Sequence, residues 1–166
     1  MDGPSARGWH QMVSIDHNVL MYGGYGSNNN IYGSNRYIND AYIFSFVFNI
    51  KNEKVGKWTR TKDVPSARWS HQMAAIGPDI LMYGGKQIRT EKLNGRTQYL
   101  DDAFLFSLSY NEKNGQVGTW IRTADGPSAR INHQMATIDP YILMYGGNDD
   151  KNKGTHKFND AYLFSL

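Results

Sequence analysis

Residues 65–85 read Pro-Ser-Ala-Arg-Trp-Ser-His-Gln-Met-Ala-Ala-Ile-Gly-Pro-Asp-Ile-Leu-Met-Tyr-Gly-Gly, and the same pattern stands twice more in the chain. Pro-Ser-Ala-Arg, a histidine three residues further on and an apolar run that ends in Gly-Gly also occur within residues 4–24 and 127–147. The proline, the histidine and the second glycine each recur after 61 and then 62 residues. Periods of tens of residues are typical of solenoids and propellers, whose units stack on one another. We therefore predict a repeat fold of three units.

The composition is that of a folded protein. Of the 166 residues 40% are hydrophobic and 13% aromatic, which excludes a disordered chain. No apolar run approaches the roughly 20 residues of a membrane helix, and no signal peptide is visible, so we expect a cytoplasmic protein without a membrane partner. The absence of cysteine fits a reducing compartment. A net charge of +3 without a basic helix argues against nucleic acid as a partner.

The second unit predicts four short strands separated by turns. We expect strand a over residues 71–76, strand b over 80–83, strand c over 102–108 and strand d over 118–123. Strand b is a continuous apolar run, which is typical of a strand buried on both faces. The following Gly-Gly pair predicts positive φ angles or a close approach by another segment. No stretch of the sequence predicts a helix.

Strand c alternates large and small side chains. In the first unit Tyr42 and Phe44 share one face, while Ala41 and Ile43 share the other. Both faces are apolar, so we expect flat sheets stacked face to face. Strand d is charged and alternating, which predicts an edge strand.

These features resemble the kelch repeat. The elements that carry the resemblance are Pro-Ser-Ala-Arg-x-x-His, an apolar run closing on Gly-Gly, a polar loop, Asp-Ala-aromatic, and a tryptophan twelve residues after the third strand, and they cover essentially the whole chain. The resemblance implies an all-β protein, a β-propeller whose blades are four-stranded antiparallel sheets with strand a nearest the axis and strand d outermost.

On this resemblance the chain holds three consecutive blades over residues 4–64, 65–126 and 127–166. The third blade would lack its outer strand, because the tryptophan that marks this strand would lie beyond Leu166. Kelch propellers usually close with more than three blades. We therefore expect part of a larger propeller, with a homodimer that closes a six-bladed ring as the alternative.

A histidine and an arginine recur at the same position in every unit, and each could have a functional role. A ring of the histidines His10, His71 and His133 could bind zinc in principle, but recurrence favours a structural role, in which they form hydrogen bonds between blades. The recurring arginines could tie together backbone carbonyls of adjacent blades, or form a carboxylate or phosphate site at a channel mouth. We predict them as binding residues while keeping both roles open: Arg7, Arg68 and Arg130.

The loops between strands b and c, at residues 25–38, 86–99 and 148–158, are where the three units differ most. A constant frame with dissimilar loops on one face is how a scaffold presents a binding surface. The second loop is rich in Lys and Arg, which favours an acidic partner. The predicted contact residues are Tyr25, Tyr32, Arg36, Arg89, Lys92, Arg96 and Tyr99.

The sequence therefore predicts a protein-interaction scaffold of the kelch type that binds a protein, such as an acidic peptide, and needs no cofactor. Catalytic motifs are absent: there is no Gly-x-Ser-x-Gly, no phosphate-binding glycine loop and no His-Glu-x-x-His. The alternative is a propeller enzyme of the oxidase, epimerase or specifier-protein type with a metal or sugar site at the channel mouth. A His in only one blade would favour it, and the two such residues, His17 and His156, are predicted to lie in turns.

Overall fold

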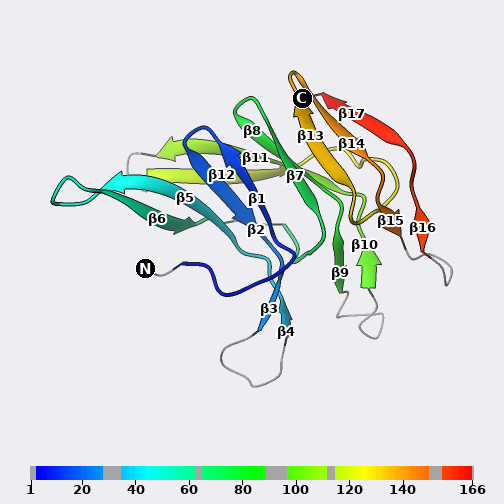
Figure 1. Cartoon of the computed structure of the whole chain (residues 1–166), viewed down its shortest axis with the longest axis horizontal. Coiled ribbons are helices and arrows are strands. Elements are labelled where there is room, and N and C mark those ends of the chain that lie inside the picture. Colours follow the sequence, from blue (N-terminus) through cyan, green and yellow to red (C-terminus); the bar gives the residue numbers. More distant parts are fainter. Residues whose placement is uncertain are drawn as a thin grey trace.

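The computed structural model describes residues 3–27, 35–62, 65–88, 97–111, 115–149 and 155–165. Within these residues all regular structure is β, and three antiparallel sheets stand side by side (Figure 1). The first sheet consists of β1 (Gln11–Ile15), β2 (Asn18–Tyr22), β5 (Ala41–Phe48) and β6 (Lys54–Arg60) in that order. The second consists of β7 (Gln72–Ile76), β8 (Asp79–Tyr83), β11 (Ala103–Asn111) and β12 (Gly115–Arg122). The third consists of β13 (Gln134–Ile138), β14 (Tyr141–Tyr145) and β17 (Ala161–Ser165).

The predicted all-β fold of antiparallel blades is confirmed. The four strands expected in the second unit are present in the order a, b, c, d, with strand d at one edge of the sheet. Strands c and d are longer than predicted, because β11 and β12 continue to pair as far as Asn111 and Gly115.

The segments predicted as polar loops contain further strands. Their described ends pair as short hairpins, which we call the b–c hairpins: β3 (Tyr25–Ser27) with β4 (Asn35–Tyr37), β9 (Lys86–Ile88) with β10 (Thr97–Tyr99), and β15 (Asn148–Asp149) with β16 (His156–Lys157). All three project from the same side of the molecule (Figure 1). These stretches carry no alternating apolar pattern, so the sequence alone does not predict the hairpins.

The hydrophobic cores lie between sheets rather than inside one. In β8, Ile80 and Met82 face the first sheet, whereas Leu81 and Tyr83 face the third. The core between the first two sheets is built from buried side chains of both sheets, Leu20 of the first sheet among them. The central strand is thus buried on both faces, as its continuous apolar run predicts.

The Gly-Gly pairs form a close backbone contact between neighbouring units. Gly24 has a φ of 104°, and its amide donates a hydrogen bond of 2.9 Å to the carbonyl of Arg68 in the next unit. A Cβ atom added to Gly23 would lie 2.6 Å from the same carbonyl oxygen. The junction between the second and third sheets repeats this geometry, since Gly85 donates at 2.9 Å to the carbonyl of Arg130. Both predicted reasons for glycine therefore apply: a positive φ and a close backbone approach.

The third Gly-Gly pair faces no neighbouring sheet within the described structure. The nearest atom to a Cβ built on Gly146 is 3.5 Å away, and it belongs to Phe158 of the same unit. Tyr83 donates a hydrogen bond of 2.6 Å to the carbonyl of Pro127 across its junction. Its counterpart Tyr145 is 56% exposed and has no hydrogen-bond partner among the described residues.

This pair of tyrosines gives a matched test of the junction. Tyr83→Phe removes a hydrogen bond across a buried junction and leaves the Pro127 carbonyl without this donor. We therefore expect the free energy of unfolding to fall by about 1 kcal/mol. Tyr145→Phe removes an exposed hydroxyl without a partner and should leave stability unchanged. Denaturant unfolding of both variants measures the difference, and equal effects would contradict the assigned role of Tyr83.

Candidate protein-binding face

Each recurring arginine lies between the ends of two strands of its own sheet. Arg68 donates to the carbonyl of Gly84 at 3.2 Å and to both carboxylate oxygens of Asp102 at 2.6 and 3.0 Å. Its Nη2 also reaches the hydroxyl of Ser66 at 3.2 Å, and the residue is 0% exposed. This bidentate arrangement joins the end of β8 to the start of β11.

The same pairing occurs in the other units, between Arg7 and Asp40 and between Arg130 and Asp160. In the third unit the Arg130 guanidinium, through its hydrogen bond, lowers the pKa of Asp160. The structure thus corrects the expectation for these arginines in two ways. The guanidinium groups connect strands within one blade rather than adjacent blades. Arg68 and Arg130 are fully buried, so they present no exposed ring to a partner.

The recurring histidines pack against the Gly-Gly pairs. The Cε1 atom of His71 would lie 3.1 Å from a Cβ built on Gly23, and that of His133 at the same distance from one built on Gly84. The predicted hydrogen bonds between blades are not observed: neither ring nitrogen of His71 or His133 has a hydrogen-bond partner in the described structure. Each ring instead makes an edge contact with the tyrosine of the preceding unit, as His71 does with Tyr22 at a centroid distance of 5.3 Å.

Burial keeps these imidazoles neutral. Desolvation, followed by the charge of Arg130, lowers the pKa of His133 to about 4. The backbone of Tyr83 raises this pKa slightly, although neither ring nitrogen of His133 has a hydrogen-bond partner in the described structure. Burial also moves the pKa of His71 well below its ordinary value. A buried neutral imidazole is a packing group here.

An aromatic cluster covers the base of the first b–c hairpin, where it meets the second unit. We use the term aromatic cluster for Trp9, Tyr25, Tyr37 and Trp69. Tyr37 stacks on Trp69 with centroids 4.4 Å apart, and Tyr25 lies 5.7 Å from Trp9 and 5.2 Å from Tyr37. The ammonium of Lys86 sits 5.2 Å from the Trp69 ring centroid. The cluster therefore combines flat aromatic surface with a cation on the side of the b–c hairpins.

Trp9 is the most unusual member of the cluster. Its side chain is 64% exposed although tryptophan is large and apolar. Its backbone has a φ of 52°, in the left-handed region that bulky side chains rarely adopt. The same position holds Ser70 in the second unit and Asn132 in the third, with φ of 57° in both. The positive φ therefore belongs to the repeat, whereas the exposed tryptophan at this position is a feature of the first unit alone.

The structure brings only part of the predicted contact set together. Tyr25 belongs to the aromatic cluster, and Tyr99 lies partly buried in β10 on the second hairpin. For Arg36 the backbone lies in β4 opposite Gly26. The remaining predicted residues lie outside the described part of the chain: Tyr32, Arg89, Lys92 and Arg96.

Trp9 and Trp69 were missed because they lie in the repeated segment itself. They occupy the two variable positions between the recurring Arg and His, which read Gly-Trp, Trp-Ser and Ile-Asn in the three units. This variation inside a constant motif was the available signal. The bridges from Gly8 to Tyr25 and from Trp69 to Lys86 show why the positions matter, because they join this segment to the b–c hairpin.

Three stacked antiparallel sheets with their connecting hairpins on one face define a β-propeller-type repeat protein. The sequence profile of the KLHDC2/KLHL20/DRC7 Kelch-repeats domain matches residues 1–166. The chain belongs to the kelch-repeat family.

Curated relatives share the repeat at low identity. Tip elongation aberrant protein 1 of Schizosaccharomyces pombe is 24% identical over 97% of this chain, and Rho GTPase-activating protein gacHH of Dictyostelium discoideum is 27% identical over 96%. Beta-scruin of Limulus polyphemus is 27% identical over 79%. This chain spans only 12%, 9% and 12% of those proteins' lengths, respectively.

Solved structures support the fold. The structure titled "Structure of YjhT" matches with a TM-score of 0.61 at 19% identity, over 89% of this chain and 36% of that one. A chain of a RAG complex with one melted and one unmelted RSS matches with a TM-score of 0.60 at 15% identity, over 99% of this chain and 52% of that one.

A search of the described residues finds no group of three or more His, Cys, Asp or Glu side chains arranged to hold a metal ion. In the same part of the chain, no helix has the length and hydropathy that crossing a membrane requires.

The buried ion pair offers a stability test. Asp102→Asn leaves the Arg68 guanidinium buried without a counter-charge, so we expect the free energy of unfolding to fall by about 3 kcal/mol. The matched control is Asp125→Asn, because the Arg122–Asp125 pair is 2.5 Å long but both side chains are 59% exposed. Exposed pairs contribute less than about 1 kcal/mol. Similar losses in the two variants, measured by denaturant unfolding, would show that burial is not what makes the Arg68 pair important.

The buried histidines predict a pH dependence. The unfolded state takes up a proton at His133 near pH 6.5, whereas the folded state does so only near pH 4. Stability is therefore fully present above this window and is lost as the pH falls through it, by about 2 kcal/mol between pH 7 and 5. His71 acts in the same direction. Unfolding at several pH values measures the slope, which His133→Gln should flatten. An unchanged slope in His133→Gln would refute the assignment.

Proposed function

We propose that this protein is an interaction scaffold that binds a protein partner through the face formed by the aromatic cluster and the b–c hairpins. The observation that carries the proposal is the exposed Trp9, whose ring packs against Tyr25 of the aromatic cluster. Tryptophan, tyrosine and arginine predominate among the residues that contribute most to binding energy. A rigid aromatic surface also loses little conformational entropy when a partner binds.

Two further facts support this proposal. Kelch repeats generally serve as protein-interaction scaffolds, and this chain belongs to that family. The three b–c hairpins share a base but differ in sequence, which is how a constant frame presents a specific surface. Fold alone does not fix function, so the proposal depends on the side chains of this face.

We propose an acidic segment as the partner. Lys86 lies against Trp69 at the base of the second hairpin, and the sequence places Arg89, Lys92 and Arg96 further along the same connection. These cations, with Arg36, Tyr32 and Tyr99, remain the proposed contact residues beyond the aromatic cluster. The proposal is non-enzymatic, and a cytoplasmic location is part of it, supported by the lack of cysteine.

We also propose that residues 4–64, 65–126 and 127–166 each form one blade, and that further blades cover the outer face of the third sheet. On that face Ile138, Tyr145 and Leu163 are more than half exposed. Apolar side chains gathered on one face of a sheet are typical of an interface. The alternative cover is a second copy of the chain, which would close a six-bladed ring. Light scattering at two protein concentrations separates a dimer from a monomer.

Trp9→Asn is the variant that tests the binding face. Asparagine occupies this position in the third unit and tolerates positive φ, so we expect stability to stay the same or rise by a few tenths of a kcal/mol. Peptides selected by phage display on the wild-type protein should bind the variant at least about tenfold more weakly in calorimetry, a loss of about 1.4 kcal/mol.

Ser70→Asn serves as the matched control, because it changes the same position in the second unit without removing an aromatic side chain. Its affinity for the selected peptides should equal that of the wild type. If Trp9→Asn binds them as tightly as the wild type does, the partner uses another surface.

A further inference from the structure

The hairpin formed by β5 and β6 projects from the body of the sheets and forms one extremity of the molecule (Figure 1). Strand β5 starts at Ala41, shortly after the first b–c hairpin ends at Tyr37, and it runs to Phe48 next to the turn 49–53. The tip of the β5–β6 hairpin and the aromatic cluster therefore lie at opposite ends of β5. A role of the tip is thus independent of the function proposed for the cluster.

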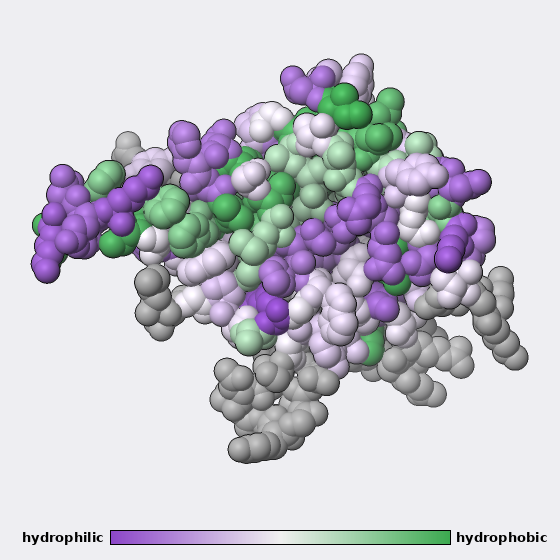
Figure 2. Space-filling model, in the orientation of Figure 1, coloured by the Kyte–Doolittle hydropathy of each residue, from purple (hydrophilic) through white to green (hydrophobic). Residues whose placement is uncertain are grey.

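Large apolar side chains are exposed at this tip. Ile50 is 104% exposed, Phe48 is 68% exposed, and Val47 is exposed as well. One exposed apolar residue is ordinary, whereas three within four residues of a protruding turn form a local patch, and apolar patches mark contacts with a protein or a membrane. Figure 2 shows hydrophilic side chains at the end of the hairpin, with hydrophobic ones beside and behind them.

A further sheet packed on the first one would not bury Phe48. Tyr110 holds the same position in the second sheet, because each residue comes seven positions after the alanine that begins its strand. Phe106 lies in the core that faces the first sheet, and alternate residues of a strand share a face, so Tyr110 is on this covered face. It is nevertheless 75% exposed. The exposure of Phe48 is therefore a property of the hairpin tip.

The turn at the tip is held in one conformation by hydrogen bonds. The Oδ1 atom of Asn49 accepts from the backbone amides of Lys51 and Glu53, both at 2.9 Å, and its Nδ2 donates to the Glu53 carboxylate at 2.8 Å. The backbone amide of Asn52 donates to the Asn49 carbonyl at 2.9 Å. Ile50 is thus presented by an ordered turn, which reduces the entropy lost when the tip is bound.

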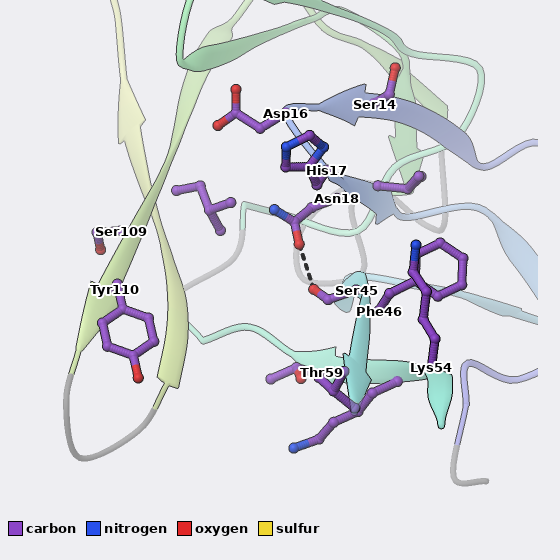
Figure 3. Close-up of a pocket in the computed structure, with 14 residues that line it drawn as sticks. Ser14, Asp16, His17, Asn18, Ser45, Phe46, Lys54, Thr59, Ser109 and Tyr110 are labelled. Carbon is purple, nitrogen blue, oxygen red and sulfur yellow. Dashed lines mark hydrogen bonds between the residues drawn. The ribbon is translucent and has the colours of Figure 1, made fainter. Parts of the chain in front are cut away.

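Positive charge is concentrated in the same hairpin. Residues 41–62 hold five of the 18 Lys and Arg residues and one of the 15 Asp and Glu residues, so this segment carries +4 and the rest of the chain −1. Lys51 and Lys54 lie at the tip, and both are exposed. The ammonium of Lys54 lies 4.5 Å from the centroid of the Phe46 ring (Figure 3). Cations therefore surround the exposed apolar side chains.

The repeat does not require these residues. In the second unit the positions of Phe48, Ile50, Lys54 and Lys57 are held by Tyr110, Glu112, Gln116 and Thr119. The hairpin also stands clear of the second sheet, since a pocket of about 1020 Å³ lies between it and the end of β11 (Figure 3). The apolar, cationic tip is thus a feature of the first unit alone.

We propose that the β5–β6 hairpin docks on a membrane surface that contains anionic lipids. Ile50 and Phe48 enter the boundary between headgroups and acyl chains, and Lys51 and Lys54 contact the anionic headgroups around them. Buried apolar area and the attraction of basic side chains to anionic lipids together set the strength of such binding. A lipid surface is favoured over a protein groove because it surrounds a convex tip with apolar and anionic groups on every side.

The expectation of no membrane partner rests on the lack of a spanning segment. A hairpin docked at the surface does not span the bilayer, so the two statements are compatible.

Co-sedimentation of the whole chain with lipid vesicles tests this proposal. One set of vesicles is phosphatidylcholine alone, and in the other a third of it is replaced by phosphatidylserine. We expect binding to the anionic vesicles only. Added salt should weaken this binding, because it screens the attraction between the lysines and the headgroups.

The double variant Phe48→Ser with Ile50→Ser tests the apolar part of the site. We expect binding to anionic vesicles to weaken at least about tenfold, because both side chains lose their burial in lipid. The melting temperature should stay unchanged, since both residues are exposed in the fold. The matched control is Leu163→Ser, which removes a 64% exposed apolar side chain from the third sheet and should bind as the wild type does.

The charged part of the site is tested by Lys51→Gln with Lys54→Gln, which should weaken binding by about tenfold. Its control, Arg60→Gln with Lys62→Gln, removes two exposed cations from the same segment. Arg60 lies about 20 Å along β6 from Lys54 at about 3.3 Å per residue. This separation is about twice the screening length at physiological salt, so the control should bind within about twofold of the wild type.

The absence of cysteine allows a label at a single chosen position. An environment-sensitive dye on Ile50→Cys should brighten when anionic vesicles are added, because it leaves water. The same dye on Lys157→Cys, an exposed site on the third b–c hairpin, should not change.

Three results would overturn the proposal. The first is no binding of the wild type to anionic vesicles at low salt, which would leave the exposed tip to a protein partner. The second is equal binding of the wild type and the Phe48→Ser, Ile50→Ser variant. The third is a response of the dye at position 157 without one at position 50.

Discussion

The hydrogen bond from the amide of Gly24 to the carbonyl of Arg68 is the contact on which the arrangement of the sheets depends. It brings two backbones within 2.9 Å, which only a glycine pair with positive φ permits. That close approach leaves the imidazole of His71 enclosed at the junction. The side chain of the same Arg68 is directed into its own sheet, where it holds Asp102. One residue thus serves the junction with its carbonyl and the sheet with its guanidinium.

The repeated unit, its four strands and their order could be predicted from the sequence, because each rests on a local pattern. The continuous apolar run of β8 indicated burial on both faces, and the structure places Ile80 and Leu81 in different cores. The b–c hairpins could not be predicted, because short strands paired through backbone hydrogen bonds leave no apolar alternation. The ends of β11 and β12 were missed for a similar reason, since their pairing extends past the buried part of the sheet.

The candidate site was less accessible to sequence reasoning. Recurrence favoured a structural role for the arginines, but it did not reveal the carboxylate partner, which lies 34 residues away from Arg68. The aromatic cluster combines Trp9 with rings from the first hairpin and from the next unit. Such a cluster depends on how the units stack, so no single stretch predicts it.

The junctions between sheets also have a direction. At each one a tyrosine hydroxyl and a glycine amide of the earlier sheet donate to carbonyls of the later unit, and a smaller set of hydrogen bonds, such as that from Thr137 to the carbonyl of Ala75, runs the other way. The outer face of the third sheet carries the donor set at Tyr145 and Gly147, whereas the acceptor positions of the first sheet are the carbonyls of Ser5 and Arg7. Two donor faces brought together would leave both sets without acceptors. The tyrosine and glycine pairing therefore favours head-to-tail addition of units, so the chain has a polarity like that of a subunit in a filament or a ring.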